Sequence, residues 1–289
     1  MSEKYQSRSL PYIVLTASLC LVGYLCYLAQ VSVNERAQAE LESYADDLQT
    51  AIQERILVYN HSLSAGNGFL HGSESVSRDE WHAFVEQLKV SETYPGIQGL
   101  GYSQVIQPED LAEHERFVRS QGFSNYRVLP EGVRDLYTSI IYLEPFSDRN
   151  LKAFGYDMFS DPTRRIAMEL ARDSGDIVMS ASVILVQEGD QDVQRGFLVY
   201  SADYDRIEVD GGFSRLPLTV EERRANLRGF VYTVFRVGDF MAGLNFRPAL
   251  NIAYRLSDET PHVDSAQMYE YSKRVHSFED ASATSEYQV

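Results

Sequence analysis

Residues 9–34 read SLPYIVLTASLCLVGYLCYLAQVSVN and contain no charged side chain. The apolar run Leu10–Ala29 is 20 residues long. At a rise of about 1.5 Å per residue, a helix of this length spans roughly 30 Å, which is the thickness of a bilayer's hydrocarbon core. The sequence therefore predicts a transmembrane helix over residues 10–30, and this helix decides how the rest of the chain is placed.

Two other interpretations of this segment fit less well. A cleaved signal peptide has an apolar region of about 7–15 residues and a cleavage site with small residues. The run here is longer, and it ends in Ala29-Gln30-Val31, which does not fit such a site. A lipid anchor would need a small residue before its cysteine, but Cys20 and Cys26 each follow a leucine. We therefore interpret the segment as an uncleaved anchor.

The flanking charges predict the orientation of this anchor. Lys4 and Arg8 precede the span, whereas the residues after it are mainly acidic: Glu35, Glu40, Glu42, Asp46 and Asp47, opposed by Arg36. By the positive-inside rule, residues 1–9 form a cytoplasmic tail and the chain after residue 30 lies outside. We expect a protein of the inner (plasma) membrane with a periplasmic or extracellular domain. Both cysteines lie in the span, so we expect no disulfide framework in the exported part.

The composition is that of a folded, acidic domain. Hydrophobic residues make up 44% of the chain and charged residues 24%, which is ordinary for a globular protein. The formal net charge of −16 opposes nucleic-acid binding, because phosphate contacts need clustered Lys and Arg. We therefore expect no nucleic-acid partner.

A stalk helix is predicted directly after the membrane, over residues 31–60. Apolar side chains recur there at alternating spacings of four and three residues: Ala37, Leu41, Tyr44, Leu48 and Ala51. This pattern is typical of a coiled-coil stripe and predicts a homodimer through the stalk. The alternative is that the stripe packs on its own domain, because only two heptads are regular. The segment up to residue 76 is rich in Ser, Gly and Asn and is interpreted as a loop.

Short helices and short strands follow this segment. Ser77 and Glu80 have the spacing of a capping box that begins a helix, and residues 108–122 form a second helix. A third begins at an Asp161 N-cap and ends at Gly175. Strands are expected at about residues 97–106, 125–129, 136–143, 152–158, 177–187, 196–203, 229–236 and 249–255. A short helix is expected at residues 238–244. Residues 205–227 are interpreted as a polar insertion. This order predicts an α+β fold with an antiparallel sheet.

Catalytic and metal-binding motifs do not emerge from the sequence. The six histidines are scattered, with no pair at the spacing of metal ligands. Gly99-x-Gly101 lacks the third glycine of a dinucleotide-binding loop, and no Gly-x-Ser-x-Gly nucleophile elbow occurs. We therefore expect no cofactor, no metal site and no enzymatic activity in this chain.

One polar residue, Asp157, lies in the aromatic-rich segment Ala153–Phe159. Strand alternation would place Asp157 and Phe159 on one face and Tyr156 and Met158 on the other. A carboxylate on an interior face needs a hydrogen-bond donor. An internal backbone N–H or arginine would supply one, and so would a ligand N–H. The residues alone leave both interpretations open.

A series of short motifs, each weak alone, follows in order over about 150 residues. They are Tyr94-Pro95-Gly96-x-x-Gly99-x-Gly101-Tyr102, Glu131-Gly132-x-Arg134-x-x-Tyr137, Ile141-Tyr142-Leu143-Glu144-Pro145, Phe154-Gly155-Tyr156-Asp157-Met158, Arg165-x-Ala167-Met168, Gly196-Phe197-Leu198-x-Tyr200, Gly229-x-Val231 and Phe235-Arg236. With these motifs, the run from about residue 94 to residue 245 resembles the CHASE domain, an extracytoplasmic sensor domain of membrane receptors.

The resemblance implies a stalk helix followed by two PAS-like α/β lobes. The membrane-distal lobe would comprise residues 77–204 and hold a small-molecule pocket. After the insertion, residues 228–289 would form the membrane-proximal lobe and a polar tail. Family members feed signalling enzymes inside the cell, so we expect this chain to be a fragment of a longer receptor. A histidine kinase or a diguanylate cyclase would follow it.

The resemblance also implies a ligand contact. In plant members an aspartate on a central strand holds an adenine-type cytokinin, and Asp157 matches the position of that aspartate. We therefore predict an adenine-like ligand bound by Asp157, with Tyr102, Tyr126, Tyr142 and Phe159 as its aromatic neighbours.

The alternative function is that of a membrane-tethered interaction domain which binds a protein partner and has no small-molecule pocket. A cavity lined by Asp157 and aromatic side chains would favour the sensor, whereas a flat exposed apolar patch would favour the interaction domain.

Overall fold

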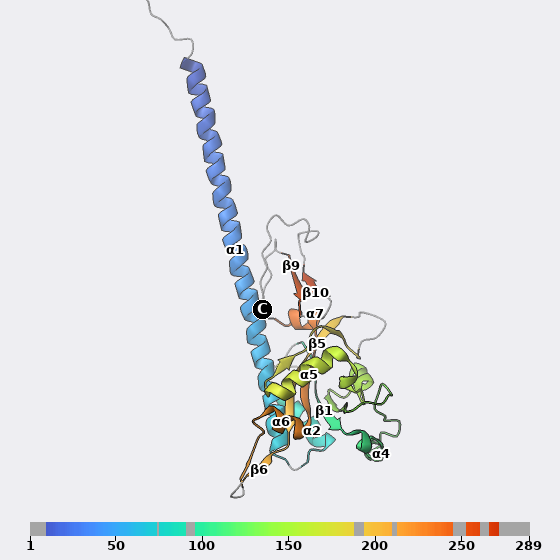
Figure 1. The fold of residues 1–289 in the computed structure, drawn as a ribbon. Helices are drawn as coiled ribbons and strands as arrows, with labels where there is room; N and C mark the ends of the chain where they lie inside the picture. The colour runs from blue at the N-terminus through green and yellow to red at the C-terminus, as the bar shows by residue number, and fades with distance from the viewer. Residues whose placement is uncertain are drawn as a thin grey trace, which may run out of the picture.

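A computed structural model describes residues 10–73, 75–90, 96–187, 194–209, 213–244, 253–260 and 266–271 (Figure 1). Some of the predicted features lie outside these residues. They are the cytoplasmic tail over residues 1–9, Tyr94-Pro95 of the first motif, the start of the strand predicted at 249–255, and the polar tail beyond residue 271.

Helix α1 (Leu10–His71) is one continuous helix of 62 residues. Among the described residues it is the one helix long and apolar enough to cross a membrane, by length and composition. The loop predicted after residue 60 is wrong, because residues 60–71 extend this helix. Leu63 and Leu70 are buried there against the domain, and this burial outweighs the low helix propensity of the neighbouring Ser and Gly residues.

The core of the domain is an antiparallel sheet. Its strand order is β2-β1-β8-β5-β3, and β4 also pairs with β5. The strands are β1 (Ile97–Ile106), β2 (Tyr137–Glu144), β3 (Val178–Met179), β4 (Val183–Ile184), β5 (Arg195–Tyr204) and β8 (Leu227–Arg236). Strand β8 lies between β1 and β5. Residues 228–236, predicted to belong to the membrane-proximal lobe, are therefore part of this central sheet.

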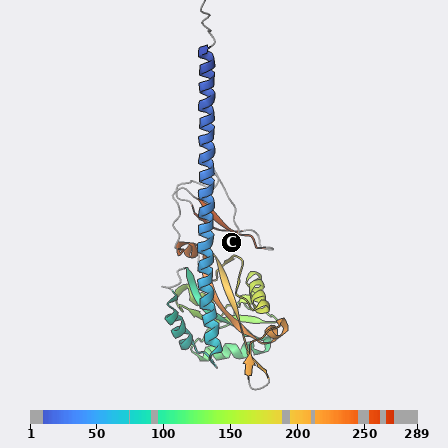
Figure 2. The same cartoon turned by 90° about the vertical axis from the view of Figure 1, so that its left-hand side faces the viewer.

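The two faces of the sheet are covered by different helices. In β8, Val231 and Phe235 contribute to the cluster that contains residues of α1 and α2 (Arg78–Leu88). Phe230 and Tyr232 point to the opposite face and join the cluster that contains residues of α5 (Pro162–Ser174). Figure 2 shows α1 running past the sheet in front of the domain. The alternation of β8 thus separates an α1 face from an α5 face.

Smaller elements complete the fold. They are η1 (Pro108–Asp110), α4 (Leu111–Ser120), η2 (Asp148–Ala153), η3 (Met158–Ser160), β6 (Ile207–Val209), β7 (Phe213–Arg215), α6 (Val220–Ala225), α7 (Val237–Ala242), β9 (Tyr254–Asp258) and β10 (Ala266–Tyr271). The predicted α+β class is confirmed. Local signals were accurate: the Ser77–Glu80 capping box forms, and α5 ends at Gly175 with φ of 76°.

Two predicted strands do not form. Residues 125–129 and 152–158 contribute only the isolated bridges Leu129–Tyr156 and Ser139–Asp157. The reason lies in Gly155, whose φ of 85° is left-handed, and in the two 3₁₀ turns η2 and η3 that flank it. The strand predicted at 177–187 is reduced to the two-residue strands β3 and β4.

The apolar stripe of the stalk packs at least partly on its own domain. Leu48 contacts the cluster that joins α1 to the sheet, and Tyr254 and Leu256 of β9 pack against the same cluster. This agrees with the alternative interpretation of the stripe for Leu48. Dimerisation through the stalk stays a prediction.

Burial predicts which residues of α1 hold it to the sheet. Leu63 is fully buried, whereas Leu57 on the same helix is 57% exposed. We expect Leu63→Ala to lower the free energy of unfolding by about 2–5 kcal/mol, because it leaves a cavity. Leu57→Ala should change it by no more than about 0.5 kcal/mol. Chemical unfolding of the detergent-solubilised protein measures both values, and equal effects would contradict the docking of α1 on the sheet.

Candidate ligand-binding site

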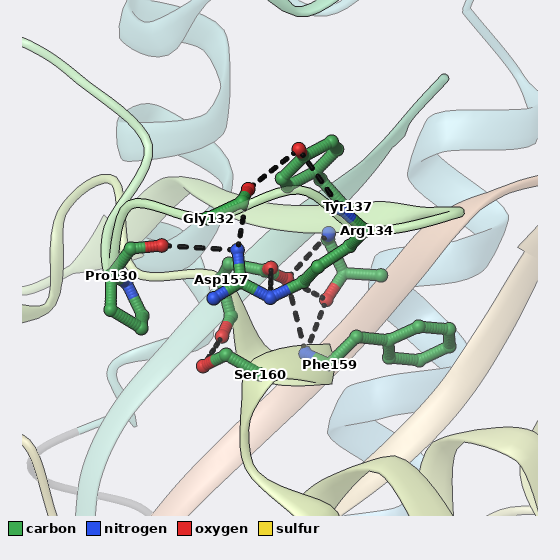
Figure 3. A network of polar contacts seen from close by, with 8 residues as sticks. Pro130, Gly132, Arg134, Tyr137, Asp157, Phe159 and Ser160 are labelled. Carbon is green, nitrogen blue, oxygen red and sulfur yellow. Dashed lines mark hydrogen bonds and ion pairs between the residues drawn. The ribbon is translucent and has the colours of Figure 1, made fainter. Parts of the chain in front are cut away.

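Asp157 is fully buried at the N-cap of η3. Its Oδ1 accepts hydrogen bonds from the backbone N–H of Thr138 (2.8 Å), the backbone N–H of Phe159 (3.1 Å) and the Thr138 hydroxyl (3.2 Å) (Figure 3). The carboxylate therefore joins η3 to the first residues of β2.

The second oxygen of Asp157 faces an arginine. Oδ2 lies 3.4 Å from Nε of Arg134 and has no hydrogen bond within the described part of the chain. Arg134 also donates from Nη1 to the carbonyl oxygens of Pro130 (3.0 Å) and Gly132 (3.4 Å). The Tyr137 hydroxyl donates to Gly132 O at 2.8 Å. Asp157 thus holds the loop of residues 130–134, which we call the rim loop, next to β2.

The electrostatics of Asp157 are dominated by its burial. Burial raises the pKa of this carboxyl, while the hydrogen bond from Thr138 N and the charge of Arg134 lower it to a smaller extent. The structure therefore supplies the internal partners that the sequence left open. A direct contact between Asp157 and a ligand stays a prediction.

A cavity of about 610 Å³ lies beside the rim loop, a size typical of small-molecule sites. It is lined by α4, the segment after it and the rim loop: Leu111, Glu115, Arg119, Ser124, Asn125, Tyr126, Arg127, Val128, Pro130, Glu131, Gly132 and Tyr137. The wall is mixed in character, because charged side chains of both signs surround the two tyrosines.

Tyr126 is the one predicted site residue that lines this cavity. Its hydroxyl lies 2.9 Å from Nε2 of His114 and 2.7 Å from Oγ of Ser139. Burial lowers the pKa of His114 to about 4, so this histidine is neutral near pH 7 and serves as a hydrogen-bond partner rather than a charge.

The other predicted aromatic residues lie elsewhere. Tyr102 and Tyr142 are register partners in β1 and β2, and both belong to the α1 face. Their hydroxyls donate to Asp203 (2.8 Å) and to Val76 O (2.6 Å). Phe159 packs on the α5 face. The structure therefore does not bring the five predicted residues to one cavity, because the sheet separates Tyr102 and Tyr142 from Phe159.

Sequence reasoning missed the role of Arg134. Its partner Asp157 lies 23 positions later in the chain, and no local pattern reports such a contact. The motif Glu131-Gly132-x-Arg134-x-x-Tyr137 carried a signal, since it contains three residues of the rim network. It did not indicate what these residues bind.

Comparison with known proteins gives one clear result. The family model of the CHASE domain matches residues 74–269, more than half of the chain. A search of curated proteins finds no match. The matched region includes the central sheet, the rim loop, the cavity and Asp157.

The burial of Asp157 predicts how pH affects stability. Its pKa in the folded protein is raised above the ordinary 3.8, so the folded state binds this proton more tightly than the unfolded state does. The resulting stabilisation is complete below pH 3.8 and is lost as the pH rises through the folded-state pKa.

Asp157→Asn cannot titrate and serves as the control. We expect the free energy of unfolding of the wild type, minus that of the variant, to fall with rising pH across this window and then to level off. Denaturant titrations at a series of pH values measure the difference. A difference that rises with pH would mean that the ion pair with Arg134, and not burial, determines the direction of the pKa shift of Asp157.

Proposed function

The chain belongs to the CHASE domain family, an extracytoplasmic sensor module of signalling receptors, and from this premise we propose that it binds a small molecule in the cavity beside the rim loop. Domains of this family bind small-molecule ligands and sit in membrane receptors. The proposal places the ligand between α4 and the rim loop.

The contact that supports this proposal is the ion pair between the partly exposed Arg134 and the buried Asp157. Pro130 and Gly132 line the cavity and accept hydrogen bonds from Arg134. Arg134 pairs with Asp157, which accepts from Thr138 in β2. This series of polar contacts therefore connects a ligand at the rim loop to β2, an edge strand of the central sheet. Such a ligand shifts the conformation if it binds one position of the loop better than another.

The central sheet packs against α1, the helix that carries the candidate membrane span. Tyr59 of α1 packs against Phe235 of β8, with ring centroids 4.7 Å apart. We propose that α1 passes the signal towards the membrane within a homodimer. Val58 supports an interface there, because it is a large apolar side chain exposed on α1. Shifts of helices at subunit interfaces are a known form of allosteric transition.

Adenine is the first probe for the cavity, because the sequence predicts an adenine-like ligand and its predicted contact, Asp157, is joined to the rim loop through Arg134. We expect adenine to bind the wild type and Ser120→Trp but not Ser124→Trp. Ser124 lines the cavity, which an indole would fill, whereas Ser120 is exposed on α4 outside it. Isothermal titration calorimetry measures the binding. Equal affinity of both variants would reject the cavity, and no binding to the wild type would reject an adenine-like ligand.

Asp157 variants separate a direct ligand contact from a structural role. A charge-assisted hydrogen bond contributes about 1.5–3 kcal/mol, so a direct contact predicts binding to Asp157→Asn weakened tenfold to a hundredfold, and further weakened in Asp157→Leu. Both variants must remain folded for this interpretation. If Asp157→Asn lowers the melting temperature before any adenine is added, the carboxylate acts as an internal partner of Arg134 and β2.

The orientation of α1 is tested by cysteine labelling. In a chain with Cys20 and Cys26 replaced by alanine, Ser64→Cys should react with a membrane-impermeant maleimide in intact cells, because Ser64 is exposed on the part of α1 after the span. Ser7→Cys should react only after the cells are lysed, since the positive-inside rule places it in the cytoplasm. The reverse pattern would contradict an extracytoplasmic sensor domain.

A further inference from the structure

Aromatic rings enclose the side chain of Arg78, the first residue of α2. Its Cζ lies 4.5 Å from the ring centroid of Phe123, 4.8 Å from that of Phe154, 5.0 Å from that of Phe146 and 5.4 Å from that of Tyr142. Its Nε is buried and has no hydrogen-bond partner among the described residues. The rings are therefore the main partners of this cation.

Three phenylalanines form the walls of this enclosure. The rings of Phe123 and Phe146 are at 90° to each other, those of Phe146 and Phe154 at 84°, and those of Phe123 and Phe154 at 62°. These are edge-to-face arrangements, which aromatic pairs favour. A guanidinium over the face of such a ring is attracted to its negative centre. We call Arg78, Tyr142 and the three phenylalanines the aromatic clamp.

A cation at the position of Arg78 needs such partners. The N-terminus of a helix is the positive end of the helix dipole, which disfavours a cation there. Burial also lowers the pKa of Arg78, although a guanidinium stays protonated near neutral pH. The rings offset both effects only while they surround the guanidinium. The position of α2 and the arrangement of the rings therefore depend on each other.

One side of the aromatic clamp adjoins the cavity beside the rim loop. The ring of Phe154 packs against that of Tyr126, with centroids 4.9 Å apart, and Tyr126 lines the cavity. Phe123 directly precedes Ser124, another lining residue. A ligand that moves this wall of the cavity would therefore also move two rings of the clamp.

The other side of the clamp leads through α2 to α1. Phe84 of α2 stacks on Phe69 of α1, with ring centroids 4.7 Å apart and an angle of 2° between the planes. Trp81 of α2 is fully buried, and its Cη2 would lie 3.6 Å from a Cβ added at Gly66 of α1. Helix α2 is thus packed against the last turns of α1.

We propose that Arg78 is a positioning residue that couples the cavity beside the rim loop to α1 through α2. The inference rests on the proposed function, because it assigns how a ligand in that cavity acts on α1. This connection differs from the one through Arg134 and Asp157, since it runs through aromatic rings and α2. A ligand that favours one arrangement of the clamp would favour the corresponding position of α2.

Amide hydrogen exchange of the full chain in detergent tests the coupling without a ligand. Arg78→Met keeps an unbranched apolar chain and removes the charge. We expect exchange roughly twofold to thirtyfold faster in residues 123–128 and 66–71, as follows from the loss of a cation–π interaction. Residues 162–174 of α5 should be unchanged, because a general loss of stability would speed exchange there too.

Two further variants separate the charge of Arg78 from its bulk. Arg78→Lys keeps a cation that can lie over the rings, so it should restore most of the protection. Arg116→Met is the matched control, because Arg116 is exposed and its Nε donates within its own helix, to Ala112 O. It should exchange as the wild type does in residues 66–71.

Phe154→Leu tests the coupling from the side of the cavity. It removes one wall of the clamp and should speed exchange in residues 66–71 as Arg78→Met does. Because both changes remove the same interaction, the double variant should exchange no faster than the faster single variant. Additive effects would show that the two side chains act independently, and would overturn the proposal.

A filled cavity supplies the most direct test of the coupling. Ser124→Trp places an indole there in place of a ligand. It should slow exchange in residues 66–71 when Arg78 is present and leave it unchanged in the Arg78→Met background, whereas Ser120→Trp should have no effect in either. Equal slowing in both backgrounds, or none in either, would overturn the role of Arg78. So would faster exchange in Arg78→Met that is confined to α2, or that Arg78→Lys does not reverse.

These outcomes are distinct from a failure of the proposed function. Adenine binding to the wild type together with no effect of Arg78→Met on residues 66–71 would leave the cavity as a ligand site and reject the coupling. Coupling seen with Ser124→Trp but no adenine binding would reject the adenine-like ligand and keep the role of Arg78.

Discussion

The packing of α1 on the central sheet is the constraint on which the rest of the structure depends. The same helix carries the candidate membrane span and, further along, the buried residues Tyr59 and Leu63. The contact is close at Gly66, where an added Cβ would lie 2.9 Å from Cγ1 of Val231 in β8. A small residue is therefore needed at that point of the helix. Because β8 is paired on both sides, movement of α1 is tied to the middle of the sheet.

Both faces of the sheet bury polar atoms without hydrogen-bond partners among the described residues, such as Trp81 Nε1 on the α1 face and the Tyr200 hydroxyl on the α5 face. On the α1 face the buried Asp203 accepts a hydrogen bond from Tyr102 and lies 3.5 Å from His71 at the end of α1. On the α5 face Arg164 and Tyr200 retain donors without partners among the described residues. Native proteins rarely leave such groups unpaired without a reason. The α1 face therefore holds the helix through apolar packing and not through complete pairing of its polar groups.

Local sequence signals predicted much of this fold. The apolar run of α1, the capping box at Ser77 and the Asp161 to Gly175 limits of α5 all act within one or two turns of chain. Residues 60–71 were missed because their helical state depends on burial against the sheet. The strand predicted at residues 152–158 does not form, because the left-handed Gly155 turns the chain there. The hydrophobic pattern of a sequence indicates neither its tertiary contacts nor which residues adopt a left-handed conformation.

The site was predictable only in part. The sequence singled out Asp157 as a carboxylate that needs a donor if its face is interior, and the side chain is buried, but its partner Arg134 comes from a separate loop. Tyr102 and Tyr142 were assigned to a pocket from their type, whereas the register of β1 and β2 directs both to the α1 face. Which face of a sheet a side chain occupies depends on pairing across strands, and that pairing is not local.

We propose that the rim loop, the sheet and α1 are mechanically connected. Amide hydrogen exchange of the wild type and of Arg134→Gln tests this connection without any ligand. If the claim is correct, loss of the Arg134–Asp157 pair speeds exchange in residues 130–138 and also in residues 59–70 of α1. A change confined to residues 130–138 would contradict the claim, because the rim loop would then move independently of α1.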